Sequence, residues 1–164
     1  ERECAMIASR TESAASMKRR EVLLRARVGL IDRAYTNAEE YICSLPEEDY
    51  VSFLSHLLSD AVNSRLDEAA ELAEHYGEEA DCNFEVIFNS ADREKLSERV
   101  LGRSAELLGK RGKDISVSVA EETADIRGGL ILRYGDIETN CSVKAVISSL
   151  RADTESEVVK VLFS

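Results

Sequence analysis

The stretch that decides the fold is 124–163, which reads ADIRGGLILRYGDIETNCSVKAVISSLRADTESEVVKVLF. A glycine pair, Gly128-Gly129, opens an apolar strand, and a tight turn around Gly135 leads into a second, shorter strand. The remaining residues run as an amphipathic helical pattern to Phe163. The stretch therefore predicts a two-stranded hairpin followed by a C-terminal helix.

The segment before this hairpin begins with a helical pattern over about 46–76. Ser44 and Glu47 have the spacing of a capping box, and Pro46 suits the first turn of a helix. Gly77 is a natural helix stop. Apolar residues recur at helical spacing, which predicts a buried stripe of Tyr50, Phe53, Leu54, Leu57, Leu58, Ala61, Val62, Leu66, Ala69 and Ala73.

The period then changes to two at 84–89 and again at 115–120, which predicts two strands. Between them a helix is expected over about 91–109, capped by Ser90 and ended by glycines. The predicted order after the first helix is αβαβββα. Because several strands alternate apolar and polar residues, we expect an α+β domain with a mostly antiparallel four-stranded sheet.

Residues 1–45 are predicted to form one long helix that pairs with a partner helix. Good helix formers dominate, and apolar residues recur at spacings of four and three, as in a coiled coil. This partner seam consists of Leu24, Val28, Ile31, Tyr35, Ala38 and Ile42, with Leu45 continuing the spacing. A helix of this length would reach about 65 Å. We therefore predict a projecting stalk helix over 1–45 and a globular domain over 46–164, in a chain that is N-terminally truncated.

Charge and composition exclude several classes of protein. The net charge of −11 argues against a nucleic-acid binder, which needs clustered Lys and Arg. The charge is uneven, since 1–45 is nearly neutral while 46–164 is strongly acidic. No run of about 18 apolar residues occurs, so no membrane span is expected. The four scattered cysteines form no CxxC pair, which favours reduced thiols.

The sequence gives no positive support for an active site, a metal site or a cofactor. His56 lies among leucines and is interpreted as structural, while His75 and Cys82 lack the second ligand pair that zinc requires. The pair Gly128-Gly129 precedes a strand, whereas a phosphate loop precedes a helix, so a close backbone approach or a bulge is the preferred interpretation. The basic cluster around Lys18-Arg19-Arg20 is either a solvated helix face or a contact for an acidic partner or an anionic membrane.

Three stretches carry a resemblance to a known family. They are 49–61, which begins DYVSFL, the glycine segment DIRGG at 125–129, and the ending KVLF at 160–163. In this order and spacing they resemble the E subunit of the V-type and A-type rotary ATPases and ATP synthases. The resemblance covers the whole chain in architecture.

The resemblance implies a non-catalytic component of the peripheral stalk, or stator, of a proton- or sodium-translocating complex. Its stalk helix would pair with the G subunit, called H in archaea, and its globular domain would dock on the B subunit of the catalytic A/B head. Gly128, Gly129, Asn140 and Ser142 are the head-docking candidates. The complex would place the chain in the cytoplasm, peripheral to the membrane.

Three other interpretations remain open at the level of sequence. A homodimeric coiled-coil scaffold would use the same seam to pair with itself. A stator-like regulator of a secretion-type ATPase would share the plan of a helix followed by a domain. A small enzyme would need a pocket with convergent polar groups, which no motif indicates.

Overall fold

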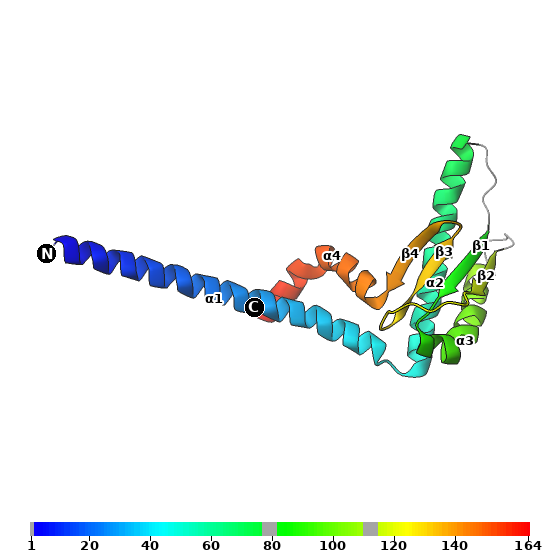
Figure 1. The fold of residues 1–164 in the computed structure, drawn as a ribbon, viewed down its shortest axis with the longest axis horizontal. Helices are drawn as coiled ribbons and strands as arrows, with labels where there is room; N and C mark the ends of the chain where they lie inside the picture. The colour runs from blue at the N-terminus through cyan, green and yellow to red at the C-terminus, as the bar shows by residue number, and fades with distance from the viewer. Residues whose placement is uncertain (1, 77–81, 110–114) are drawn as a thin grey trace. The chain divides into compact units, whose positions relative to one another are not determined.

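The computed structural model describes residues 2–76, 82–109 and 115–164 (Figure 1). The elements in these ranges are α1 (Arg2–Cys43), α2 (Glu47–Tyr76), β1 (Asn83–Ile87), α3 (Ser90–Leu108), β2 (Ser116–Val119), β3 (Gly129–Tyr134), β4 (Ile137–Ser142) and α4 (Val143–Phe163). They divide into two compact units. Unit 1 holds Glu1–Ala38 with Arg151–Ser164, and unit 2 holds Glu39–Leu150.

Unit 2 is built on a four-stranded sheet with the strand order β2-β1-β3-β4. The pair β1–β2 is parallel, whereas β1–β3 and β3–β4 are antiparallel. The sheet is therefore mixed and mostly antiparallel. The predicted α+β class is confirmed, as is the predicted hairpin at the end of the sheet.

One face of this sheet carries the hydrophobic core. Phe84 and Val86 of β1 and Leu130 and Leu132 of β3 are buried, and each is separated from the next by a residue on the other face. Helices α2 and α3 cover this face in Figure 1. The predicted stripe of α2 supplies five buried residues to the core, Tyr50, Leu54, Leu58, Val62 and Leu66.

Small polar residues let α2 and α3 pack closely. The buried Ser55 hydroxyl donates to the Val51 carbonyl in its own helix at 2.7 Å and also lies 3.4 Å from the Val100 carbonyl of α3. Ser104 of α3 is buried as well and donates to Leu101 at 2.9 Å. Each hydroxyl donates to a backbone carbonyl of its own helix. It can therefore be buried at the contact between the helices without the free-energy cost of an unpaired polar group.

The other face of the sheet carries a row of ion pairs centred on Arg133 of β3. Glu85 and Glu138 are its partners in register on the neighbouring strands, at 3.2 and 2.7 Å. Glu122 from the loop after β2 adds a third carboxylate. These three carboxylates raise the pKa of the Arg133 guanidinium, above all through its hydrogen bond to Glu138. Cross-strand pairing of this kind supports the observed register.

Two predicted helix caps are wrong in detail. Helix α2 begins at Glu47, so Ser44 lies too early to cap it, and its hydroxyl donates to the Tyr41 carbonyl of the preceding helix. Helix α3 is capped by Asn89 and not by Ser90, because the Asn89 side chain accepts from the backbone N–H of Asp92 at 2.7 Å. Asparagine and serine are about equally good caps, so composition alone could not separate these neighbours.

One of the three predicted helix stops lies within the described residues. Gly109 is the C-cap of α3, as predicted. Gly77 and Gly112 lie outside the described residues. The division of the chain into a stalk over 1–45 and a domain over 46–164 stays a prediction.

Candidate functional site

The predicted functional regions are the partner seam on α1 and the glycine pair at the start of β3. The seam residues up to Ala38 belong to unit 1, whereas Ile42 and the glycine pair belong to unit 2. Neither region brings together the side chains of a reaction centre.

The seam residues differ in how far they are covered. Leu24 and Val28 are 62% and 52% exposed, whereas Ile31 is only 7% exposed. Tyr35 is half-buried, and Ala38 is exposed. Ile42 and Leu45 pack against the core of unit 2. The upper part of the seam, around Leu24 and Val28, thus presents apolar side chains to solvent.

Ile31 and Tyr35 lie where α4 contacts α1 inside unit 1. The Tyr35 hydroxyl and the Thr154 hydroxyl are 2.9 Å apart and form a hydrogen bond. Arg151 pairs with Asp32 at 2.8 Å, and its guanidinium lies 5.2 Å from the centre of the Tyr35 ring. Part of the seam is thus covered by α4 of the same chain, which was not predicted from the sequence.

The basic cluster lies on the exposed surface of α1. Lys18 and Arg25 both pair with Glu21, at 3.0 and 2.9 Å. Such pairs at helical spacing on an exposed surface contribute about 0.2–0.5 kcal/mol each. Arg27 lies 5.2 Å from the centre of the Phe163 ring at the end of α4. This exposure is compatible with both predicted interpretations of the basic cluster, a solvated helix face and a contact for an acidic partner or an anionic membrane.

The glycine pair Gly128-Gly129 is a point of close backbone approach. A Cβ on Gly128 would lie 2.6 Å from the Tyr50 hydroxyl and 2.9 Å from the Cys43 sulfur. Gly129 has a φ of +92°, and a Cβ there would lie 2.6 Å from backbone atoms of Cys141 to Val143. The interpretation of a close approach is confirmed, and it explains why two glycines are needed in succession.

Polar contacts fix this close approach in place. The Gly129 N–H donates to the Tyr50 hydroxyl at 3.0 Å, and that hydroxyl donates to Asp92 at 3.1 Å. The Asn89 side chain also donates to Asp92, at 2.8 Å. On the other side, the Gly128 carbonyl accepts from Val143 at 3.0 Å, at the first residue of α4.

Burial changes the titration of this network. It raises the pKa of the Tyr50 phenol, so the hydroxyl stays protonated and can donate. Burial also raises the pKa of the Asp92 carboxyl, although the hydrogen bonds from Tyr50 and Asn89 act in the opposite direction. Asp92 is thus a partly desolvated acid that is held by two donors. Its neighbours make it a structural residue.

Asn140 and Ser142 serve the start of α4. The Ser142 hydroxyl accepts from the Ala145 N–H at 3.2 Å, as a helix N-cap does. The Asn140 side chain accepts from the Ser142 N–H at 2.9 Å. Of the four head-docking candidates, Gly128, Gly129 and Ser142 are buried, while Asn140 is exposed. Their role in docking stays a prediction.

The histidines and cysteines do not assemble into a reactive group among the residues that the structure describes. His56 is exposed, and its ring Nδ1 lies 2.8 Å from the Ser52 carbonyl of its own helix. Burial raises the pKa of the thiols of Cys43 and Cys141, which disfavours the thiolate. Within the ranges described, no three His, Cys, Asp or Glu side chains gather as metal ligands. The side chains of Cys4 and His75 lie outside the described residues.

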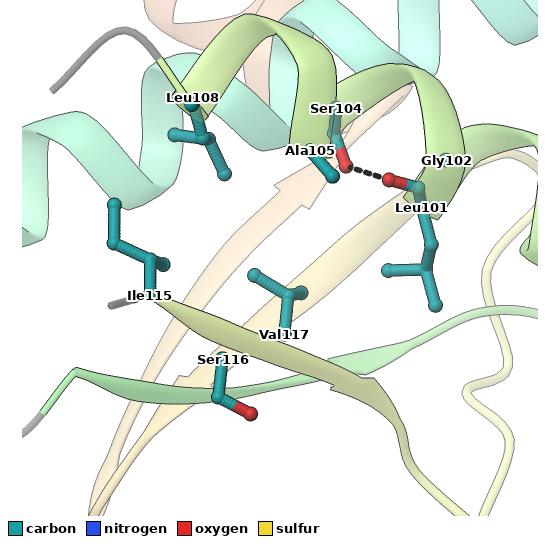
Figure 2. A pocket seen from close by; sticks show the side chains of 9 residues that line it. Leu101, Gly102, Ser104, Ala105, Leu108, Ile115, Ser116 and Val117 are labelled. Carbon is teal, nitrogen blue, oxygen red and sulfur yellow. Dashed lines mark hydrogen bonds between the residues drawn. The ribbon is translucent and has the colours of Figure 1, made fainter. Parts of the chain in front are cut away.

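A pocket of about 490 Å³ lies between α3 and β2 (Figure 2). Leu101, Leu108, Ile115 and Val117 line it with apolar side chains, and the Ser104 hydroxyl is already bonded to Leu101. Ser116 is the other polar side chain of the lining. This lining offers no pair of groups for acid–base or nucleophilic chemistry.

The network around Asp92 was not predicted from the sequence, although the spacing of Asn89 and Asp92 indicates part of it. Asparagine followed three residues later by an acid is typical of the reciprocal cap of a helix N-terminus. Here the acid also receives the Tyr50 hydroxyl from α2. That third contact joins residues 42 positions apart, which local spacing does not reveal.

The fold is thus a long helix followed by an α+β domain. The family model described as ATP synthase (E/31 kDa) subunit matches residues 1–163. The chain belongs to this family, the E subunits of the V-type ATP synthases. Within the described ranges, no helix is both long and apolar enough to cross a membrane.

Curated relatives carry matching names. The E subunit of a V-type ATP synthase from Acetivibrio thermocellus is 32% identical over 120 residues, which cover 73% of this chain and 52% of the relative. The E subunit of a V-type proton ATPase from Clostridium botulinum strain Loch Maree is 31% identical over 157 residues, which cover 96% and 70%. Its counterpart from Thermoanaerobacter pseudethanolicus is 29% identical over 85% of this chain and 62% of its own length. The chain thus spans about half to 70% of these relatives.

The glycine geometry leads to a matched pair of substitutions. Gly129→Ala should lower the free energy of unfolding by about 3 kcal/mol or more, because it combines a positive φ with a backbone clash. Gly102→Ala in α3 meets nothing within 4 Å and should raise it by about 0.5–1 kcal/mol. Urea unfolding followed by circular dichroism measures both. Equal effects of the two changes would contradict the close approach.

The raised pKa of Asp92 predicts a pH effect on stability. The folded state binds a proton more readily than the unfolded state, so this residue's contribution to stability falls as the pH rises above its ordinary pKa of 3.8. Asp92→Asn removes the titration and keeps an oxygen for Tyr50 and Asn89. The free energy of unfolding of the wild type should therefore decline relative to that of the variant as the pH is raised from about 4. A constant difference as the pH rises would rule out the shift.

Proposed function

We propose that this chain acts in the peripheral stalk of a V/A-type ATPase or ATP synthase that moves protons or sodium ions. It contributes no catalytic residues of its own. Its helix α1 pairs with the elongated helical G/H subunit, and its globular part docks on the B subunit of the A/B head. The complex lies on the cytoplasmic side, peripheral to the membrane. Family membership supports the proposal, together with the names of the relatives.

The observation that carries the helix pairing is the exposed upper seam. Leu24 and Val28 are large apolar residues at coiled-coil spacing, and both are more than half exposed. Burying such a side chain against a partner gains about 1.5–3 kcal/mol. A stator has to resist torque, and an extended helix pair with a continuous apolar seam provides stiffness without any reaction centre.

The docking proposal concerns the globular part. Asn140 is exposed at the edge strand β4, while Gly129 and Ser142 lie beneath the surface. We expect the glycine pair and Ser142 to hold β4 and the start of α4 in shape, and Asn140 to face the B subunit. The described side chains of this region are not arranged for chemistry, so shape and hydrogen bonding would carry the interaction.

The seam predicts unequal effects of two neighbouring leucines. Leu24 lies in the seam, while Leu23, which is 55% exposed, faces away from it. Leu24→Glu should weaken binding of the purified G/H subunit by about tenfold or more, and Leu23→Glu by much less. Isothermal titration calorimetry measures both affinities. A stable homodimer of the wild type that ignores the G/H subunit would favour the homodimeric scaffold.

The docking proposal predicts that Asn140→Arg weakens binding to the purified B subunit by about tenfold, because a bulky cation replaces a short polar group. Ser116→Arg on β2, at the opposite edge of the sheet, is the control and should leave binding unchanged. Surface plasmon resonance on the immobilised B subunit measures both values, with circular dichroism to verify folding. Equal loss from both variants would argue against β4 as the docking edge.

A further inference from the structure

The lower part of the seam, around Ile31 and Tyr35, is already covered by α4, the last helix of the chain itself. Ile31 is buried in unit 1, while Leu24 and Val28 on the same stripe stay exposed. The red C-terminal end of α4 lies against α1 in Figure 1. The contacts run from Tyr35 at Thr154 to Arg27 at Phe163, so α4 lies antiparallel to α1 there.

Polar side chains take part in this cover. Arg151 makes the ion pair with Asp32 and lies over the Tyr35 ring, and Tyr35 bonds to Thr154. Both members of the ion pair remain partly exposed, so solvent screens their attraction. Helix α4 thus meets α1 with an arginine and a threonine, and with the Phe163 ring only at its end.

Several apolar side chains near the end of α4 remain exposed, although Val158 is half-buried and the Phe163 ring lies beside Arg27. Val161 is 82% exposed, and Val159 and Leu162 are also exposed. A helix that belonged permanently in the seam would present such residues to it, as a coiled-coil partner does. The contact thus leaves apolar surface open on both helices.

We propose that the last part of α4, Arg151–Ser164, is a displaceable cover of the partner seam. A partner helix that pairs with Leu24 and Val28 and continues along the same stripe reaches Ile31 and Tyr35. Two helices cannot cover one face of α1 at once, because packed helices lie about 8–10 Å apart. The partner helix replaces α4 there, and the contacts of Arg151 and Thr154 open.

This inference rests on the proposed pairing with the G/H subunit and adds a regulatory step to it. The covered state lowers the apparent affinity for the partner by the fraction of molecules that are open. Without its partner, the chain shields Ile31 from solvent and from self-association. When the partner is present, its helix replaces α4 because it matches the apolar seam better.

The test removes the main anchor of the cover. Arg151→Ala breaks the ion pair to Asp32 and the contact with the Tyr35 ring, and it leaves every residue of the seam unsubstituted. The dissociation constant for the purified G/H subunit should fall by about threefold or more. Arg103→Ala, which removes an exposed arginine from α3, should leave it unchanged. Calorimetry on the full chain measures all three proteins.

A fluorescence reporter follows the displacement directly. The chain has no tryptophan, so Phe163→Trp places a single one at the end of α4, beside Arg27. Addition of the G/H subunit should shift its emission to longer wavelength as the helix leaves α1. The same mixture with the wild-type chain supplies the background spectrum.

The outcomes separate the two proposals. If the G/H subunit binds and Arg151→Ala weakens or does not change binding, the cover is overturned and the pairing stands. An emission that stays constant or moves to shorter wavelength also overturns the cover, since α4 then remains in place. If the G/H subunit binds neither the variants nor the wild type, the proposed pairing itself fails, and the cover fails with it.

Discussion

The close approach at Gly128-Gly129 is the constraint on which unit 2 depends. The backbone there passes so near Tyr50, Cys43 and the segment Cys141–Val143 that a side chain on either glycine would collide with them. Its N–H and C=O groups then find partners in Tyr50 of α2 and Val143 of α4. One short stretch thus joins the long helix of the core to the start of the last helix, and Tyr50 extends the connection to Asp92 of α3.

This arrangement explains the structural role of the buried polar groups around Tyr50. The Tyr50 hydroxyl and the Asp92 carboxylate are both engaged in structural hydrogen bonds, and burial holds the phenol in its protonated form. The thiols of Cys43 and Cys141 are disfavoured as thiolates for the same reason. These described polar groups thus maintain the shape of the domain, which agrees with a family whose relatives are named as subunits of an ATP synthase.

Much of the fold could be predicted because its signals are local. The apolar stripe of α2 repeats over several turns, and the strands β1 and β2 alternate over four or five residues. The hairpin is marked by Gly135, whose φ of +55° suits a tight turn. The predicted N-cap of α3 was wrong by one residue, because Asn89 and Ser90 are both good caps and only the backbone geometry separates them. The contact of Tyr50 with Asp92 was not predicted, since nothing in the spacing of residues from two helices shows that they meet.

The seam shows the same limit for function. The sequence by itself determined the elements, the class of the fold, the seam residues and the family resemblance, because periodicity, glycine positions and motif order are properties of the chain. Only the tertiary structure decided which seam residues face solvent. Ile31 and Leu24 occupy equivalent positions in the pattern, yet one is buried and the other exposed. The reason is physical: burial depends on what packs against a side chain, and α4, which contacts Tyr35 on the same stripe, lies more than a hundred positions further along the chain.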